Sequence, residues 1–344
     1  MLECKVHAAL DLRVTDVPAP RPGPGEVLLR LGAAGICGSD MHYYFHGRVG
    51  NFVVREPLTP GHEASATVAA LGEGVTRVAV GDRVAVNPSA PCGRCPGCRE
   101  GCENLCTNMR FLGSASVFPH VQGMFRELFV MPESQCVPVR TDVSMQEIAM
   151  SEPLSVAPHS ANRAGPLLGR RVLVTGSGTI GCMMVLAARL AGAAHVAITD
   201  VVDAPLAVAR GVGADVAVRS DALGGAALAD AVGVPDVAFE VSGAPSALIS
   251  CIETVRRGGI VVQVGTLPAE GMHLPANQIM ARELDVRGSF RFGNVFGHAV
   301  DAIATRRVDV RPVISPSQPL GEAARAIELA RDKTRSMKVH LVPA

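Results

Sequence analysis

The chain has 344 residues, of which 48% are hydrophobic and 36 are glycines, and its 32 basic residues balance its 32 acidic ones. This composition predicts a globular α/β protein of about two domains, and its zero net charge favours a small-molecule partner over nucleic acid or an anionic membrane. No apolar run reaches the roughly 18 residues that a membrane span needs, and the N-terminus lacks an apolar signal core, so we expect a cytoplasmic protein.

Residues 1–154 predict a compact β-rich domain, because they carry most of the proline turn signals and several short apolar runs. One motif in this region supplies a thiolate at Cys37, and another supplies an imidazole at His62 and a carboxylate at Glu63. Glu152 supplies a second carboxylate. Zinc accepts these ligand types, and a catalytic zinc keeps three protein ligands so that water or substrate takes the fourth position. We therefore predict an open metal site here. Packing in a core is the alternative role for each cysteine or histidine taken alone.

Five of the ten cysteines lie within fifteen residues, at Cys92, Cys95, Cys98, Cys102 and Cys106. Two-residue gaps between cysteines let a tight turn direct both sulfurs at one centre, and four thiolates close a tetrahedral zinc shell. The even spacing of the first three favours Cys106 over Cys102 as the fourth ligand. Disulfides are the alternative, but a chain of this length does not need them and residues 1–12 show no apolar signal core. We predict a structural zinc site.

A strand, a glycine-rich turn and an alanine-rich helix follow one another over 171–191. In such a turn Gly176 permits the tight bend, Gly178 lets the backbone approach a pyrophosphate, and Gly181 lets the helix pack on the strand. Asp200 ends the next strand, where a carboxylate binds the ribose hydroxyls and repels a 2′-phosphate. Asp200 therefore predicts NAD rather than NADP as cofactor. A cap at the end of the strand is the alternative role of Asp200. The residues expected to bind the cofactor are Gly176, Gly178, Thr179, Ile180, Gly181, Asp200, Val264 and Gly265.

Further short apolar strands alternate with helical stretches downstream, at 215–218, 236–241, 259–265 and 284–290. Together with the two strands above they predict a doubly wound parallel sheet, a Rossmann domain over 155–294. The tail predicts a helix near 320–332 and a last strand over 337–342, and we expect residues 295–344 to return to the β-rich domain.

These motifs resemble the zinc-containing medium-chain dehydrogenases, and within them the polyol dehydrogenase branch, over nearly the whole chain. Other segments that carry the resemblance are 37–44, 50–52, 109–115, 118–121, 134–138 and 287–292. The resemblance implies a GroES-like catalytic domain, a Rossmann domain and an active site in the cleft between them. It also implies hydride transfer from a secondary alcohol to NAD, one catalytic and one structural zinc ion per chain, and a homotetramer or homodimer.

The resemblance also implies roles for single residues near the metals. Cys37 and His62 match the catalytic zinc ligands, and Glu63 and Glu152 match carboxylates that share the remaining coordination. Asp40 matches the carboxylate that orients His62, as metal-bound imidazoles generally require. The structural site is expected to comprise Cys92, Cys95, Cys98 and Cys106, with Cys102 as an extra.

Other matched residues concern the reaction and the substrate. Ser39 and His42 match a relay that carries the alcohol proton to solvent, and Arg291 matches a contact to polyol hydroxyls. Phe292 stands where some relatives have tyrosine, so one polar contact is missing. Including Glu152, the expected catalytic residues are Ser39, His42, Glu152 and Arg291. The side chains expected along the substrate are Tyr43, Tyr44, Arg110, Phe111 and Ser114.

The resemblance favours a polyhydroxy acid or polyol as substrate, with L-idonate oxidised at C5 as the first choice. Arg110 and Arg48 lie in segments expected to form the cleft, and an arginine fork binds a carboxylate bidentately; surface solvation is the alternative for both. Sorbitol, L-iditol, xylitol, galactitol and L-threonine are the alternative substrates. A zinc-free quinone reductase and a non-enzymatic zinc-binding module are the alternative classes.

Overall fold

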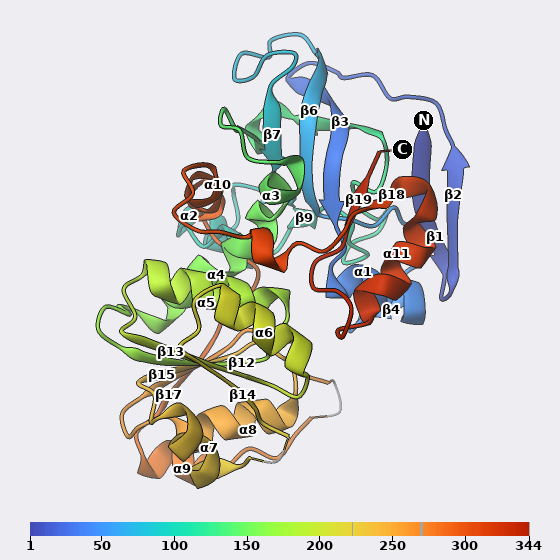
Figure 1. Cartoon of the computed structure of the whole chain (residues 1–344). Helices are drawn as coiled ribbons and strands as arrows, with labels where there is room; N and C mark the ends of the chain where they lie inside the picture. Colours follow the sequence, from blue (N-terminus) through green and yellow to red (C-terminus); the bar gives the residue numbers. More distant parts are fainter. Residues whose placement is uncertain (222, 269–270, 344) are drawn as a thin grey trace.

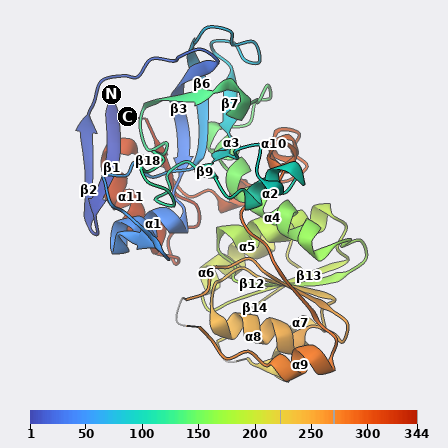
Figure 2. The ribbon, with the colours of Figure 1, turned by 180° about the vertical axis from the view of Figure 1, so that it is seen from behind.

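Two sheets organise the chain: a mostly antiparallel one built from the first 140 residues and the tail, and a parallel one built from the middle (Figure 1). The computed structural model describes residues 1–343 except 222 and 269–270. Helix α4 (Ser151–Ala164) lies between the two sheets in both views (Figures 1 and 2) and contacts strands of each. Residues at the start of α4 therefore face the junction between the two halves.

The antiparallel sheet has the strand order β11-β7-β6-β3-β19-β18, and β10 also pairs with β3. Its pairing places Gly35, at the end of β3, opposite Glu63, at the start of β6. The tail strand β19 lies on the other side of β3, with His340 opposite Gly35. The strands are β3 (Glu26–Gly35), β6 (Glu63–Leu71), β7 (Arg83–Val86), β10 (Leu128–Pro132), β11 (Cys136–Pro138), β18 (Gln318–Pro319) and β19 (His340–Val342).

Smaller elements surround this sheet. The strands β1 (Leu2–Ala8) and β2 (Asp11–Asp16) form a hairpin, and short pairs join β4 (Arg48–Val49) to β5 (Phe52–Val53) and β8 (Ser89–Ala90) to β9 (Arg110–Phe111). The helices of this half are α1 (Gly38–His46), α2 (Pro96–Arg99), α3 (Met145–Ala149) and α11 (Ala323–Arg331), with 3-10 turns η1 (Glu103–Leu105), η2 (Glu133–Gln135) and η4 (Leu320–Glu322). Helix α10 (Phe296–Ala304) contacts α4 and α3, and the turn η3 (Arg311–Val313) contacts α6 (Asp203–Gly211), so both lie at the junction with the parallel sheet.

The parallel sheet has the order β14-β13-β12-β15-β16-β17, the doubly wound arrangement that the sequence predicts. The order reverses between β12 and β15, and ligands of such sheets bind beyond the carboxyl ends of the strands at that point. The strands are β12 (Arg171–Thr175), β13 (His195–Asp200), β14 (Val216–Arg219), β15 (Val237–Glu240), β16 (Ile260–Gln263) and β17 (Asp285–Gly288). Besides α4, its helices are α5 (Thr179–Leu190), α6 (Asp203–Gly211), α7 (Gly225–Val232), α8 (Pro245–Thr254) and α9 (Ala276–Ala281).

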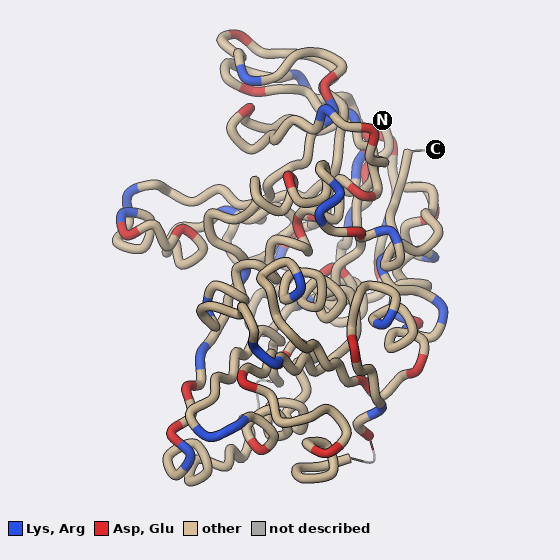
Figure 3. The backbone as a smooth tube through the Cα atoms, turned by 60° about the vertical axis from the view of Figure 1, so that its left-hand side comes forward, with Lys and Arg blue, Asp and Glu red and all other residues tan. Residues whose placement is uncertain are grey.

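Strand β12 shows why the middle of the chain forms this layered structure. Val172 and Val174 point into the core under α4 and α5, whereas Leu173 points into the core under α7 and α8. Because successive strand residues face opposite sides, a strand buried on both faces reads as an unbroken apolar run. None of the described helices is long and apolar enough to cross a membrane. Basic and acidic residues are interspersed along the backbone (Figure 3).

Candidate active site and metal centres

The first predicted metal site forms where β3 and β6 pair. Cys37 follows β3 by one residue, and Glu63 opens β6, so the register that sets Gly35 beside Glu63 also brings the two motifs together. One ligand atom each from Cys37, His62 and Glu63 lies within 4.8 Å of the others. A thiolate, an imidazole and a carboxylate around one point are a donor set that suits an open zinc site.

Asp40 holds this group in place. Its buried carboxylate accepts hydrogen bonds from the Cys37 amide at 2.9 Å and the Gly61 amide at 3.0 Å, and its Oδ1 lies 3.8 Å from His62 Nδ1. Burial raises the pKa of Asp40, and the neighbouring His62 lowers it. At 3.8 Å this contact is electrostatic rather than a hydrogen bond, and it places a carboxylate on the Nδ1 side of the ring, as a histidine that binds a metal through Nε2 requires.

Lys338 is a member of the site that sequence reasoning missed. Its Nζ lies 2.7 and 2.6 Å from the two Glu63 carboxylate oxygens and donates to the Ile36 carbonyl at 3.0 Å. Both charged side chains are buried, and a Cβ at Gly35 would come within 2.2 Å of the Glu63 carboxylate. A lone lysine in the apolar run that leads into β19 was the available signal, since lysine is almost never fully buried without a partner.

Glu152 lies near this group but outside it. Its carboxylate is not among the ligand atoms gathered within 4.8 Å. Burial raises the pKa of Glu152 to about 7, with a smaller upward contribution from Glu63 and an opposing one from His62. The structure therefore favours Glu63 as the carboxylate in contact with a metal at this geometry, and it leaves Glu152 beside the site at the start of α4.

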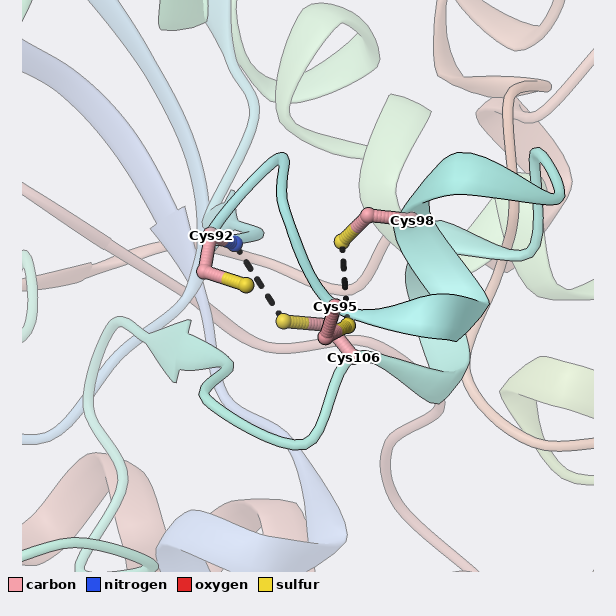
Figure 4. A group of neighbouring side chains, drawn as sticks. All are labelled: Cys92, Cys95, Cys98 and Cys106. Atoms are coloured by element: carbon pink, nitrogen blue, oxygen red, sulfur yellow. Dashed lines mark hydrogen bonds between the residues drawn. The ribbon is translucent and has the colours of Figure 1, made fainter.

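The cysteine lobe gathers the four cysteines that the spacing favours. The sulfurs of Cys92, Cys95, Cys98 and Cys106 lie within 4.8 Å of one another and converge on one point (Figure 4). The Cys92 amide donates to the Cys106 sulfur at 3.2 Å, and backbone amides lower the pKa of Cys95 to about 6. Cys102 is exposed and outside the cluster. Four converging sulfurs fit a closed tetrahedral zinc site.

An aromatic and cationic wall borders the first site. The ring of Phe111 lies 5.5 Å from that of His62, and the Arg291 guanidinium carbon lies 4.5 Å from the Phe111 ring centroid. Tyr43 is buried, and its hydroxyl oxygen accepts a hydrogen bond from the Ala115 amide at 3.0 Å. Ser114, the residue before this amide, is also buried. The structure thus brings Arg291, Phe111, Tyr43 and Ser114 into one neighbourhood.

Two of the expected substrate residues do not join this neighbourhood. Tyr44 packs on the core of the β-rich half and lies 4.9 Å from the Phe45 ring, because adjacent residues of α1 point to different sides of the helix. Arg110 is exposed, and as the strand neighbour of Phe111 it points to the opposite face. Tyr44 and Arg110 therefore lie outside this neighbourhood, and their place along the substrate stays a prediction.

The two relay residues lie on α1 directly after Cys37. Ser39 is half-buried and His42 is exposed. His42 lines a cavity of about 400 Å³ together with Gly38, Met41 and residues of the first hairpin and α11. This position lets His42 contact solvent while Ser39 stays close to the metal ligands.

The glycine turn has the geometry of a dinucleotide site. Gly176 has φ +95°, and a Cβ there would lie 2.8 Å from Ser242; a Cβ at Gly181 would lie 1.9 Å from the Gly176 carbonyl oxygen. Space is open at Gly178, the N-cap of α5, whose first two residues are Thr179 and Ile180. Free amides at this helix N-terminus suit a pyrophosphate.

Asp200 ends β13 beside this turn with both carboxylate oxygens fixed. One oxygen accepts from the Ser177 amide at 2.6 Å and hydroxyl at 3.1 Å, and the other accepts from the amides of Val201 and Val202 at 2.7 and 3.0 Å. Across the sheet, Val264 and Gly265 follow β16, and a Cβ at Gly265 would lie 2.7 Å from the buried Glu240 carboxylate. The expected cofactor residues thus meet at the carboxyl edge of the sheet.

Comparison with known proteins agrees with this architecture. Residues 23–141 match the alcohol dehydrogenase GroES-like domain, and residues 179–305 match the zinc-binding dehydrogenase domain. L-Idonate 5-dehydrogenase (NAD(P)+) of Escherichia coli K12 is 41% identical, over 92% of this chain and 91% of that protein. Sorbitol dehydrogenase of Gallus gallus is 38% identical, over 95% of this chain and 92% of that protein.

The crystal structure of the Escherichia coli L-idonate 5-dehydrogenase superimposes on this chain with a TM-score of 0.94 and 39% identity. The match covers 99% of this chain and 97% of the crystallised one. Identity at this level over the full length of both domains goes beyond a shared fold. The chain therefore belongs to the zinc-binding dehydrogenases of the alcohol dehydrogenase family, which confirms the resemblance and the GroES-like and Rossmann fold class predicted from its motifs.

Proposed function

We propose that the protein oxidises a secondary alcohol of a polyhydroxy acid or polyol with NAD as hydride acceptor, and that L-idonate, oxidised at C5, is its substrate. One observation carries the proposal: the Cys37, His62 and Glu63 group lies beside the Phe111 and Arg291 wall. A metal site next to a half-buried guanidinium suits a substrate with several hydroxyls, because a simple alcohol would leave that guanidinium desolvated and unpaired. The full-length similarity to an L-idonate dehydrogenase supports the choice of substrate.

Residues of this chain divide the chemistry among them. Zinc, when bound by Cys37, His62 and Glu63, supplies a Lewis acid that lowers the pKa of the reacting hydroxyl. Arg291 donates hydrogen bonds to further hydroxyls and so fixes which carbon faces the cofactor. Ser39 takes the alcohol proton, and His42 passes it to solvent.

The Rossmann half supplies the second substrate site. Asp200 accepts hydrogen bonds from the adenosine ribose, and the turn at Gly176 to Gly181 places backbone amides at the pyrophosphate. We keep residues 1–154, 155–294 and 295–344 as the proposed domain limits. We also propose a cytoplasmic homotetramer or homodimer, which sedimentation velocity of the purified protein tests.

The metal assignment has a direct test. Cys37→Ala and His62→Ala should each lose one zinc ion per chain, as measured by atomic emission, and should lose turnover while the circular dichroism spectrum stays that of the parent. A variant that keeps both zinc ions and most of its activity would remove that residue from the site.

A neutral polyol is the second candidate substrate, and the position of Arg110 favours it. Because Arg110 is exposed and faces away from Phe111, it offers no fork for a substrate carboxylate. The deciding measurement is kcat/KM with NAD on L-idonate, sorbitol, L-iditol, xylitol, galactitol and L-threonine. A higher value on sorbitol or L-iditol than on L-idonate would assign the enzyme to neutral polyols, and turnover of none would refute the proposal.

A further inference from the structure

The segment that carries Arg291 runs along one face of helix α4 and is hydrogen-bonded to it at three points. Arg163 Nε donates to the Gly288 carbonyl at 2.9 Å, the hydroxyls of Ser160 and Ser289 lie 3.0 Å apart, and the Gly293 amide donates to His159 Nδ1 at 3.3 Å. These contacts fix the segment on both sides of Arg291, whereas residues 290–292 between them, which the structure describes, make no hydrogen bond to α4.

Asn104 of the cysteine lobe fills this gap. Its side chain is buried, and its Nδ2 donates to the Phe290 carbonyl at 3.0 Å. The same Nδ2 lies 3.4 Å from His159 Nε2. A neutral imidazole has one acceptor nitrogen, and Nδ1 uses it for the Gly293 amide, so the bond to Phe290 is the one that Asn104 makes.

The position of Asn104 in the lobe ties this bond to the cysteine cluster. Asn104 is the middle residue of η1, two residues before Cys106. The Cys106 sulfur in turn lies in the group with Cys92, Cys95 and Cys98. A displacement of the lobe would therefore move the donor that holds Phe290.

Arg291 needs such support. Its φ of +53° lies in the left-handed region, which a non-glycine residue occupies at a cost and keeps only when its surroundings impose it. Its guanidinium lies against the Phe111 and Phe290 rings, 4.5 and 4.8 Å from their centroids. Phe290 thus contributes both a carbonyl that Asn104 holds and a ring that Arg291 stacks on.

We propose that Asn104 is a positioning residue through which the cysteine lobe holds Arg291 in place for the substrate. The proposal rests on the proposed function, because it takes Arg291 as the residue that binds substrate hydroxyls. It gives the structural metal site a role in substrate affinity beyond its role in folding.

Two variants and one matched control test this proposal on the purified zinc-loaded enzyme. Asn104→Ala removes the donor, and Asn104→Asp keeps the shape of the side chain but replaces the donor with an acceptor that repels the Phe290 carbonyl. Leu105→Ala, at an exposed neighbour on the same turn, is the control. We expect both Asn104 variants to raise KM for the sugar substrate about tenfold, since misplacing a binding group by about 1 Å has effects of this size or larger.

The expected result has further parts that a purely structural role would not produce. kcat should fall by less than KM rises, the Kd for NADH should not change, and each variant should keep two zinc ions per chain. In an Arg291→Ala background the Asn104→Ala change should have no further effect on KM, because the two residues act through one contact.

An unchanged KM in both Asn104 variants would overturn the proposal, and so would an equal rise in KM with and without Arg291 or loss of the lobe zinc from both variants. If Arg291→Ala alone left KM unchanged, the assignment of Arg291 in the proposed function would fail and the proposal with it. If Arg291→Ala raised KM while the Asn104 variants did not, only the role of Asn104 would fail.

Discussion

The preference for NAD over NADP that we predict depends on the Asp200 carboxylate, whose orientation is fixed by hydrogen bonds. Both oxygens of Asp200 are held by amides or a hydroxyl of Ser177, Val201 and Val202. A 2′-phosphate placed about 4 Å from it would meet a repulsion of roughly 1 to 4 kcal/mol per unit charge, depending on how much solvent screens the pair. Loss of the ribose hydrogen bond adds about 1.5 kcal/mol or more. We predict a discrimination of at least about 2 kcal/mol, or roughly 30-fold in kcat/KM.

The structure adds Arg219, which sequence reasoning did not consider. Arg219 ends β14 and lies opposite Asp200 in the parallel pair. Its guanidinium makes salt bridges to Asp203 at 3.1 Å and Asp221 at 2.6 Å. Because these carboxylates already neutralise the arginine, it does not cancel the charge of Asp200.

Three variants separate these contributions. Asp200→Asn should lower kcat/KM for NAD about tenfold and raise it for NADP, and the difference between the cofactors should shrink with added salt. Asp221→Asn should leave Arg219 paired with Asp203 alone and so raise kcat/KM for NADP without changing it for NAD. Asp301→Asn, an exposed residue on α10, is the control. Equal efficiency of the parent enzyme with both cofactors, or an unchanged ratio in Asp200→Asn, would show that Asp200 only caps its strand.

Three further predictions concern stability. Cys95→Ala should lower Tm by roughly 5 °C or more, because a structural metal site contributes folding free energy, whereas Cys102→Ala should melt like the parent in differential scanning fluorimetry. Lys338→Met should lower the free energy of unfolding in urea by about 3 to 5 kcal/mol, because it removes the cationic partner of the buried Glu63. If Glu63→Gln added to this variant restores none of the loss, the two residues are not coupled. Burial lowers the pKa of His340 to about 3 from 6.5. Because the imidazole of the unfolded chain is protonated at a higher pH than that of the folded chain, the free energy of unfolding should fall as pH drops from about 6.5 towards 3. His340→Leu should flatten this part of the stability profile, and an unchanged profile would contradict the reasoning.

The elements and motifs that the sequence predicts well depend on local patterns. The strands around β12 are apolar runs with a fixed alternation, and the turn at Gly176 and Gly181 has a spacing that few other structures require. The cysteine spacing likewise selects four of five sulfurs and leaves out Cys102. In each case the residues that define the feature lie within one short segment.

The sequence does not specify the direction of every side chain or the pairing of distant strands. Tyr43 and Tyr44 are adjacent on a helix, so the helical period alone places them on different faces. Lys338 meets Glu63 only because β19 and β6 flank β3 on opposite sides. Such pairings depend on how strands far apart in the sequence align, and a single sequence does not specify that register.

The buried charges around the first metal site indicate what that site requires. Metal binding requires Cys37 as a thiolate and His62 as a neutral imidazole. In that state Cys37, Asp40 and Glu63 bring three negative charges, and Lys338 brings one positive charge. Two negative charges in a buried setting remain uncompensated, and isolated buried charges are costly. A divalent cation bound by Cys37, His62 and Glu63 would balance them. The folded state of this half should therefore gain stability from the catalytic metal, although that site is open. The catalytic and structural sites then both support the fold, and they differ in their chemistry.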